Sequence, residues 1–167
     1  MEGRSVIGRL RRHHALEHAT LSVLARRTPV TGLFARSDLQ GFVVYGEVAT
    51  PALRQAAEEG LVRLKAGQSE LAVHPNCGTG LVTAGVLAGV GSLLATDRWG
   101  RSVWERLPLA VLGATVALFW ARPVGRWAQV NLTTSADVLG LRIAAIQELP
   151  LIGVRRHRVA LAAESAP

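Results

Sequence analysis

Three of the chain's five histidines lie within residues 13–18, in the stretch HHALEH. If this stretch is helical, His14 and His18 are four residues apart and lie side by side on one face. Two imidazole nitrogens in that arrangement can bind one zinc ion. Glu17 precedes His18, and its carboxylate could accept a proton from a water molecule that attacks a carbonyl group. The stretch therefore predicts a zinc site in which Glu17 is the general base.

Two histidines do not complete such a site, because catalytic zinc usually has three protein ligands and one open position. The best remaining donors are His74 and Cys77, in the stretch HPNCGTG. Pro75, Asn76 and Gly78 predict a turn that would expose both side chains. We therefore predict Zn²⁺ as the cofactor, with Cys77 or His74 as the third ligand.

A second interpretation of these residues involves packing alone. Histidines on the apolar face of a helix are often hydrogen-bonded core residues, and Glu17 could pair with His13 at the i, i+4 spacing. Cys77 is the only cysteine of the chain, which excludes an intramolecular disulfide. A single buried cysteine usually packs as a small hydrophobic residue. His157, in the stretch RRHRV, is expected to lie on the surface of a strand.

Two apolar segments predict a transmembrane hairpin, although a buried hairpin of a soluble protein would show the same composition. Residues 78–96 contain no charged side chain, and nineteen helical residues nearly span a bilayer core of roughly 30 Å. Gly85 and Gly89 form a G-x-x-x-G step that would let a second helix approach closely. The expected partner is the shorter segment 107–121. Tryptophans favour the membrane, because all four lie where an aromatic belt would place them: Trp99, Trp104, Trp120 and Trp127.

The basic charge of the chain could indicate nucleic-acid binding, a membrane surface or solubility alone. The net charge is +7, with 49% hydrophobic residues. The arginines occur mostly in twos and threes without interleaved aromatic residues, so we expect no nucleic-acid binding. The loop between the apolar segments and its edge hold three of the nineteen basic residues, which predicts that both termini are cytoplasmic.

The segments outside the hairpin predict an α+β fold with an N-terminal amphipathic helix over residues 5–27. Its predicted packing face consists of Ile7, Leu10, His14, Glu17, His18 and Leu21. The hairpin would separate two strand–helix–strand units of one small cytoplasmic domain. The first unit has strands at 41–49 and 69–74 and a helix that Thr50 and Pro51 begin and Gly67 ends. The second has strands at 127–132 and 155–161 and a helix at 133–149.

This organisation gives three parts in chain order. Residues 1–77 hold the N-terminal helix and the first βαβ unit, residues 78–122 the transmembrane hairpin, and residues 123–167 the second βαβ unit. Four strands and two helices arranged in this way predict a ferredoxin-like sheet.

Four stretches occur in order around the apolar segments: HHALEHATLSVL, GFVVYGEV, ELAVHPNCGTG and VNLTTSADVLGL. With them the chain resembles a bacterial two-transmembrane family of unknown function, over roughly residues 9 to 150. This resemblance implies a multi-pass protein of the bacterial inner membrane and no particular activity.

A shorter resemblance concerns the histidine motif. Residues 14–18, HALEH, resemble the H-x-x-E-H motif of inverted-motif zinc peptidases. The downstream glutamate that those enzymes use as third ligand has no clear counterpart, and Glu58, Glu59 and Glu70 are candidates by elimination. A His-His-Cys set beside a glutamate also resembles the ligands of peptide deformylases.

Two functions follow as hypotheses. The first is a membrane-anchored zinc-dependent hydrolase of peptidase or amidase type. The second is a non-enzymatic assembly or scaffold protein whose histidine-rich helix packs or binds a structural metal. We expect the lipid bilayer and a peptide or protein substrate as partners, and a second copy of the chain bound through the glycine-rich helix of residues 78–96.

Overall fold

The computed structural model describes residues 5–27, 32–97, 102–149 and 155–164. The chain divides into two compact units. We call Met1–His74 with Val130–Pro167 the sheet unit, and Pro75–Gln129 the helical unit.

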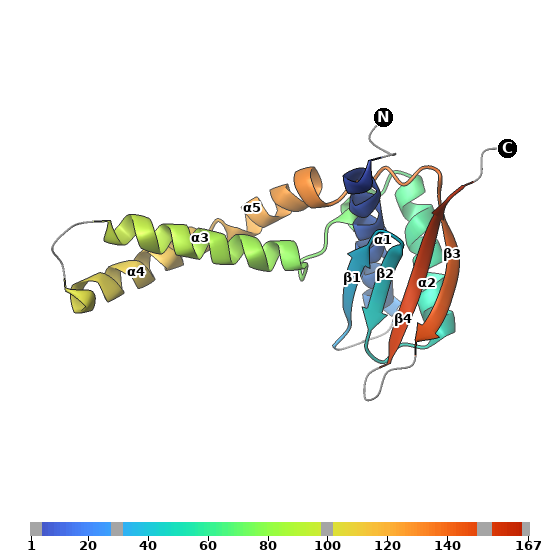
Figure 1. The fold of residues 1–167 in the computed structure, drawn as a ribbon, viewed down its shortest axis with the longest axis horizontal. Coiled ribbons are helices and arrows are strands. Elements are labelled where there is room, and N and C mark those ends of the chain that lie inside the picture. The colour runs from blue at the N-terminus through green and yellow to red at the C-terminus, as the bar shows by residue number, and fades with distance from the viewer. Residues whose placement is uncertain (1–4, 28–31, 98–101, 150–154, 165–167) are drawn as a thin grey trace. The chain divides into compact units, whose positions relative to one another are not determined.

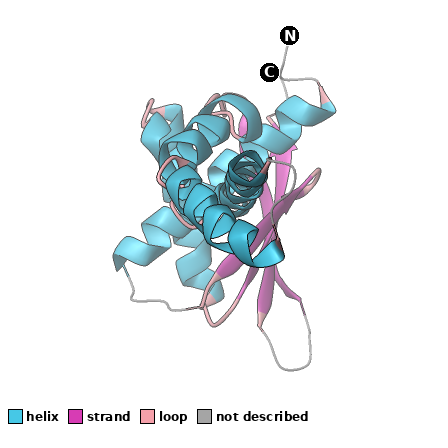
Figure 2. Ribbon diagram, turned by 90° about the vertical axis from the view of Figure 1, so that its left-hand side faces the viewer, coloured by secondary structure: helices cyan, strands magenta, loops and turns pink. Residues whose placement is uncertain are grey.

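The sheet unit is an α+β layer structure, as the sequence predicts. Its elements are α1 (Val6–Arg27), β1 (Phe34–Asp38), β2 (Gly41–Tyr45), α2 (Thr50–Lys65), the 3-10 turn η2 (Ser69–Ala72), β3 (Leu141–Leu149) and β4 (Arg156–Ala163). Within the described ranges, four strands form one sheet in the order β1-β2-β4-β3, and every neighbouring pair is antiparallel. Helices α1 and α2 cover one face of this sheet (Figure 1, Figure 2).

The core lies between the two helices and the covered face of the sheet. Alternate residues of the strands point into it, among them Phe42, Val44 and Val159, each with no exposed surface. The predicted N-terminal helix is confirmed, but its first turns do not pack as predicted. Ile7 is 71% exposed and Leu10 is 40% exposed, because the buried part of α1 begins only at His13.

Helices α1 and α2 approach each other closely at Gly60. A Cβ atom added there would lie 3.2 Å from the backbone of Ala19 and Thr20. The absence of a side chain at Gly60 therefore sets the distance between the two helices.

We expect Gly60→Leu to destabilise the sheet unit by roughly 2 kcal/mol, because a larger side chain forces the helices apart. The gain in helix propensity over glycine, about 0.8–1 kcal/mol, offsets only part of this cost. The measurement is hydrogen exchange of sheet-unit amides in urea. Tryptophan fluorescence would not follow the sheet unit, because all four tryptophans lie within residues 99–127. The matched control is Val62→Leu, at a position 66% exposed on the same helix. Equal stability of the two variants would contradict the role of Gly60.

The predicted strand–helix–strand units are wrong. Residues 69–74 begin with the 3-10 turn η2, residues 127–132 belong to helical structure, and the predicted helix at 133–149 contains strand β3. Only three predicted elements have counterparts of the same type. The strand at 41–49 corresponds to β2, the helix from Thr50 to α2, and the strand at 155–161 to β4. The sheet is built instead from the hairpin β1–β2 and the antiparallel pair β3–β4.

An irregularity in the sheet explains the error at β3. The register of β3 against β4 shifts between Ile143 and Ala145. Such a shift moves the following side chains by one position, so the inward-facing residues of β3 are not strictly alternate. Leu141 and Ile146 are both buried at a separation of five residues. A separation of five residues does not fit the two-residue period by which a regular strand is recognised.

Thr50 and His157 form a contact that the sequence did not reveal. The structure places His157 in the core with no exposed surface, so its predicted surface position is wrong. Its Nε2 lies 3.0 Å from Oγ1 of Thr50, at the start of α2. Thr50 therefore does not serve as the predicted N-cap, a position that Ala49 occupies. Among the described residues, Nδ1 of His157 has no hydrogen-bond partner.

The pKa of His157 is lowered, chiefly because the ring is buried. The negative charges of Glu148 and Glu47 raise this pKa in part, and the positive charge of Arg155 lowers it further. The sheet unit should therefore lose stability as the pH falls. Above pH 6.5 the ring is neutral in both states; below it, the unfolded chain takes up a proton that the native ring resists. The free energy of unfolding should fall by at most about 1.4 kcal/mol per pH unit until the native pKa is reached.

The measurement is urea unfolding between pH 7.5 and 5, with the sheet unit followed by hydrogen exchange. His157→Gln should give a smaller slope in this window than the unaltered chain. The slope should not vanish, because burial also lowers the pKa of His13. Identical slopes for the two proteins would assign the acid sensitivity to other groups.

The helical unit contains α3 (Gly78–Thr96), α4 (Val103–Leu118), α5 (Ala121–Ala128) and the start of a π-helical turn, η3 (Gln129–Thr133). Helices α3 and α4 approach closely where Gly91 meets Gly113: a Cβ atom on Gly91 would lie 2.4 Å from the Gly113 carbonyl oxygen. The predicted G-x-x-x-G step does not make this contact, since a Cβ atom on Gly85 or Gly89 would meet nothing within 4 Å.

Within the described residues, one helix is long and apolar enough by itself to cross a membrane, α3. All its residues are described, and none of them is buried. A second span results only if α4 and the following helical segment, bent by 51°, count as one. The predicted two-helix transmembrane hairpin is therefore not confirmed. Trp104 and Trp120 are exposed, whereas Trp99 lies outside the described residues.

Candidate metal site

The first component of the site is the pair His14 and His18 on α1. Their ring centroids are 4.3 Å apart. His18 is buried, with 1% of its surface exposed, and His14 is half-buried. Both belong to the well-packed middle of α1, where Leu16 and Ala19 face the core. The helical spacing thus brings the two imidazoles together as the sequence predicts.

The hydrogen bonds of these two rings define which ring nitrogen carries the proton. Nδ1 of His14 lies 3.0 Å from the carbonyl oxygen of Thr133, and Nδ1 of His18 lies 2.8 Å from that of Ala72. A carbonyl oxygen only accepts, so each Nδ1 must donate its proton. In the neutral ring, the lone pair is then on Nε2. Metal-binding histidines almost always have such a second hydrogen bond, which fixes the tautomer and the ring orientation.

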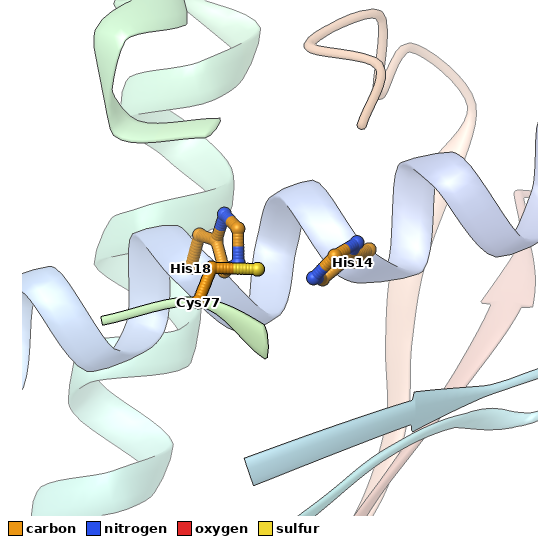
Figure 3. Close-up of side chains that lie close together, drawn as sticks. All are labelled: His14, His18 and Cys77. Carbon is orange, nitrogen blue, oxygen red and sulfur yellow. The ribbon is translucent and has the colours of Figure 1, made fainter. Parts of the chain in front are cut away.

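The third member of the group is Cys77. His14, His18 and Cys77 each offer one ligand atom, and these atoms all lie within 4.8 Å of one another (Figure 3). Ligand atoms around a tetrahedral zinc are roughly 3.3–3.7 Å apart, given bonds of about 2.0–2.3 Å. Small side-chain rotations would therefore bring the three atoms to bonding positions, and the group could hold a metal ion.

The surroundings of Cys77 suit a thiolate. Cys77 precedes α3 as its N-cap residue, and its Sγ accepts a hydrogen bond of 3.4 Å from the backbone N–H of Thr79. The N-terminus of a helix carries a partial positive charge that favours an anion. The thiolate is the form of cysteine that binds metals.

His74 lies beside the same pair. Its ring centroid is 5.8 Å from that of His18, within the sheet unit. Cys77 follows three residues later, so the extended chain can place its Cα no more than roughly 11 Å from that of His74. Both predicted third ligands therefore remain within reach of the histidine pair.

Glu17 lies between His14 and His18 in the sequence. It is buried, with 5% of its surface exposed. Its carboxylate accepts a hydrogen bond from the hydroxyl of Ser37 on β1. Its neighbour His13 donates its Nδ1 proton to the carbonyl oxygen of Asp38, 2.8 Å away. Burial lowers the pKa of His13, and the charges of Arg9 and Arg12 lower it further. The role of Glu17 as a base stays a prediction.

The acidic residues considered as peptidase-type ligands are not members of the group. Glu58 and Glu59 lie on α2 and form ion pairs with arginines: Arg54 for Glu58, and Arg27 and Arg63 for Glu59. Glu70 lies in η2. The metal group within the described residues is His14, His18 and Cys77.

Sequence reasoning missed the groups that orient the two rings. They are main-chain carbonyls of Ala72 and Thr133, which are 54 and 119 residues from their histidines. Every residue has a carbonyl, so no side-chain signal could have identified these two. Ser37 was missed for a different reason, because a lone serine in a strand has no distinctive pattern.

Comparison with known proteins places the chain in a family. A family model described as "Domain of unknown function (DUF6391)" matches residues 9–146. A relative from Picosynechococcus sp. (strain ATCC 27264 / PCC 7002 / PR-6), described as an uncharacterized protein, is 35% identical over 155 residues, covering 83% of this chain and 72% of the relative. No solved structure matches. The sequence resemblance to a family of unknown function is thus confirmed, whereas the likeness to zinc peptidases is not tested.

Proposed function

The chain belongs to the DUF6391 family, and we propose that it is a membrane-anchored, zinc-dependent hydrolase. The observation that carries the proposal is the state of the two histidines. Each has its Nδ1 proton committed to a backbone carbonyl, so that in the neutral ring the lone pair that can bind a metal is on Nε2. Cys77 supplies a third ligand atom within 4.8 Å.

The donor set favours zinc. Two imidazole nitrogens and one thiolate are ligands that zinc prefers over the oxygen ligands of magnesium and calcium. Three protein ligands leave a fourth position open, which is typical of catalytic rather than structural zinc. A bound zinc ion would supply a Lewis acid for a carbonyl group and lower the pKa of water.

Glu17 is the residue that we assign to proton transfer. It lies next to His18 on α1, and the hydroxyl of Ser37 donates a hydrogen bond to its carboxylate. This hydrogen bond limits the rotation of the carboxylate. A carboxylate in such a site accepts a proton from the attacking water and then transfers it to the leaving amine.

The anchor in this proposal is α3. A helix of nineteen uncharged, mostly apolar residues with none buried needs an apolar environment, and a bilayer provides one. We propose that α4 with the bent segment after it forms a second span, which would make the protein multi-pass in the bacterial inner membrane. With both termini in the cytoplasm, the sheet unit would act on a peptide or amide at the cytoplasmic face.

Activity of the full chain in maltoside detergent tests the proposal. The zinc-loaded protein is incubated with a mixture of peptides and N-acylated peptides, and new termini are detected by mass spectrometry. Glu17→Gln should keep its zinc but lose hydrolysis by about 10²–10⁴-fold, the usual contribution of a general base. Hydrolysis that is absent, or that Glu17→Gln retains in full, would contradict the proposal.

One observation favours a second function. The ring of His74 lies 5.8 Å from that of His18, close enough for a modest movement to add it as a fourth ligand. Four protein ligands would close the site, as in structural zinc centres. The protein would then be a membrane assembly or scaffold factor without hydrolytic activity.

A further inference from the structure

A pocket of about 280 Å³ lies in the sheet unit, and its lining includes residues from the first half of α1 and from the end of β4. Its lining includes none of the three residues of the metal group, His14, His18 and Cys77. Its polar lining comes from α1, namely Arg9, Arg12 and His13. Residues three and four apart on a helix are neighbours, so the two guanidinium groups and the imidazole lie on one side of α1. The remaining lining is Leu39, Gly140, Leu141, Leu161, Ala162 and Ala163.

The charge near this pocket is positive. The side chain of Asp38 contributes negative charge to the environment of His13, and that carboxylate is paired with Arg158. Nη2 of Arg158 also donates to the side-chain oxygen of Gln40 at 2.8 Å. Among the residues that the structure describes, the lining of the pocket includes two arginines and no acidic side chain.

The ring of His13 contributes a second kind of contact. Its Nδ1 is committed to the carbonyl oxygen of Asp38 at 2.8 Å, which fixes the ring at the pocket wall. Nε2 is the ring nitrogen left for a ligand. A wall that combines guanidinium groups with an imidazole is well suited to oxygen atoms that carry negative charge.

We propose that this pocket binds the phosphate or carboxylate group of a small molecule, held by Arg9 and Arg12 against His13. The volume lies just below the usual range of ligand pockets, roughly 300–1,000 Å³, so the ligand is small. The side chains of Leu39, Leu141 and Leu161 would contact its apolar part. The proposal does not depend on the zinc site.

Binding of small anions to the full chain tests this inference. Calorimetry in phosphate-free maltoside buffer at constant ionic strength compares inorganic phosphate, phenyl phosphate, acetate and phenylacetate. Arg9→Gln/Arg12→Gln should weaken binding of the preferred anion by at least about tenfold, because charge-assisted hydrogen bonds are lost. Arg36→Gln removes one exposed charge from β1 outside the pocket and should change the affinity by less than about twofold.

The choice of probes also identifies the ligand group. Tighter binding of phenyl phosphate than of phenylacetate assigns the pocket to phosphate, and the reverse order assigns it to carboxylate. Phosphatidylglycerol added to the micelles tests whether the phosphate belongs to a lipid headgroup. If it does, the lipid should displace phenyl phosphate from the pocket. The inference is overturned if no probe binds at about 10 mM, or if the double arginine variant binds as well as the Arg36→Gln control.

Discussion

Substitution of His18 by alanine is expected to weaken zinc binding by about 10²–10³-fold, and His14→Ala and Cys77→Ser should have effects of the same order. Structural zinc sites with four protein ligands have apparent binding free energies of about 10–16 kcal/mol, so each ligand accounts for roughly 2.5–4 kcal/mol. The affinity of the purified full chain is measured by competition with a zinc-sensitive chelating dye. The unaltered protein should also retain about one zinc ion per chain after purification.

Glu17→Gln is the matched control for the ligand variants. It lies in the same turn of α1 and removes a charge at a buried position, yet it leaves all three ligand atoms in place. Its zinc affinity should remain within about tenfold of the unaltered protein, because an adjacent group that does not bind the ion has only an indirect effect. Circular dichroism checks that each variant is folded. Equal losses in Glu17→Gln and His18→Ala would show that disturbance of α1, rather than ligand removal, lowers the affinity.

The parts of the fold that could be predicted are those with local signals. Helix α2 begins with Thr50 and Pro51 and is followed by Gly67, whose positive φ of +88° favours glycine. Helix α1 has a long apolar stripe. Strand β3 could not be predicted, because its shifted register against β4 breaks the two-residue period that identifies strands. The position of His157 in the core depends on its distant contact with Thr50, which no local pattern encodes.

The candidate site shows the same division between local and distant information. The helical spacing of His14 and His18 is local, and it correctly predicted two adjacent imidazoles. Their orientation depends on carbonyl oxygens of η2 and of the segment after α5, which only the folded sheet unit brings to α1. The choice between His74 and Cys77 was open in the sequence, because both residues share one turn. The geometry favours Cys77 as the third member. His74 lies near enough that its binding or absence as a fourth ligand would decide whether the site is closed or open.

Removal of zinc should destabilise the sheet unit by about 4 kcal/mol when the free zinc concentration is 1,000-fold above the dissociation constant. The reason is linkage: the ion binds the native chain, in which α1 and residue 77 are close, far better than the unfolded chain. Urea unfolding with and without a chelator is the measurement. Hydrogen exchange should locate the loss of protection in α1 and η2, because His18 on α1 is also bonded to Ala72.

His74→Ala separates an open metal site from a closed one in the same experiment. In an open three-ligand site, zinc should stabilise this variant almost as much as the unaltered protein, whereas Cys77→Ser should lose most of the stabilisation. In a closed site, His74→Ala and Cys77→Ser should lose similar amounts, because each removes one of four ligands. Cobalt substitution gives an independent test, since a small thiol or hydroxamate can change the visible spectrum by direct binding only where a coordination position is free. A cobalt spectrum that no such ligand alters, together with a destabilised His74→Ala, would assign the metal to structure and remove the basis for hydrolysis.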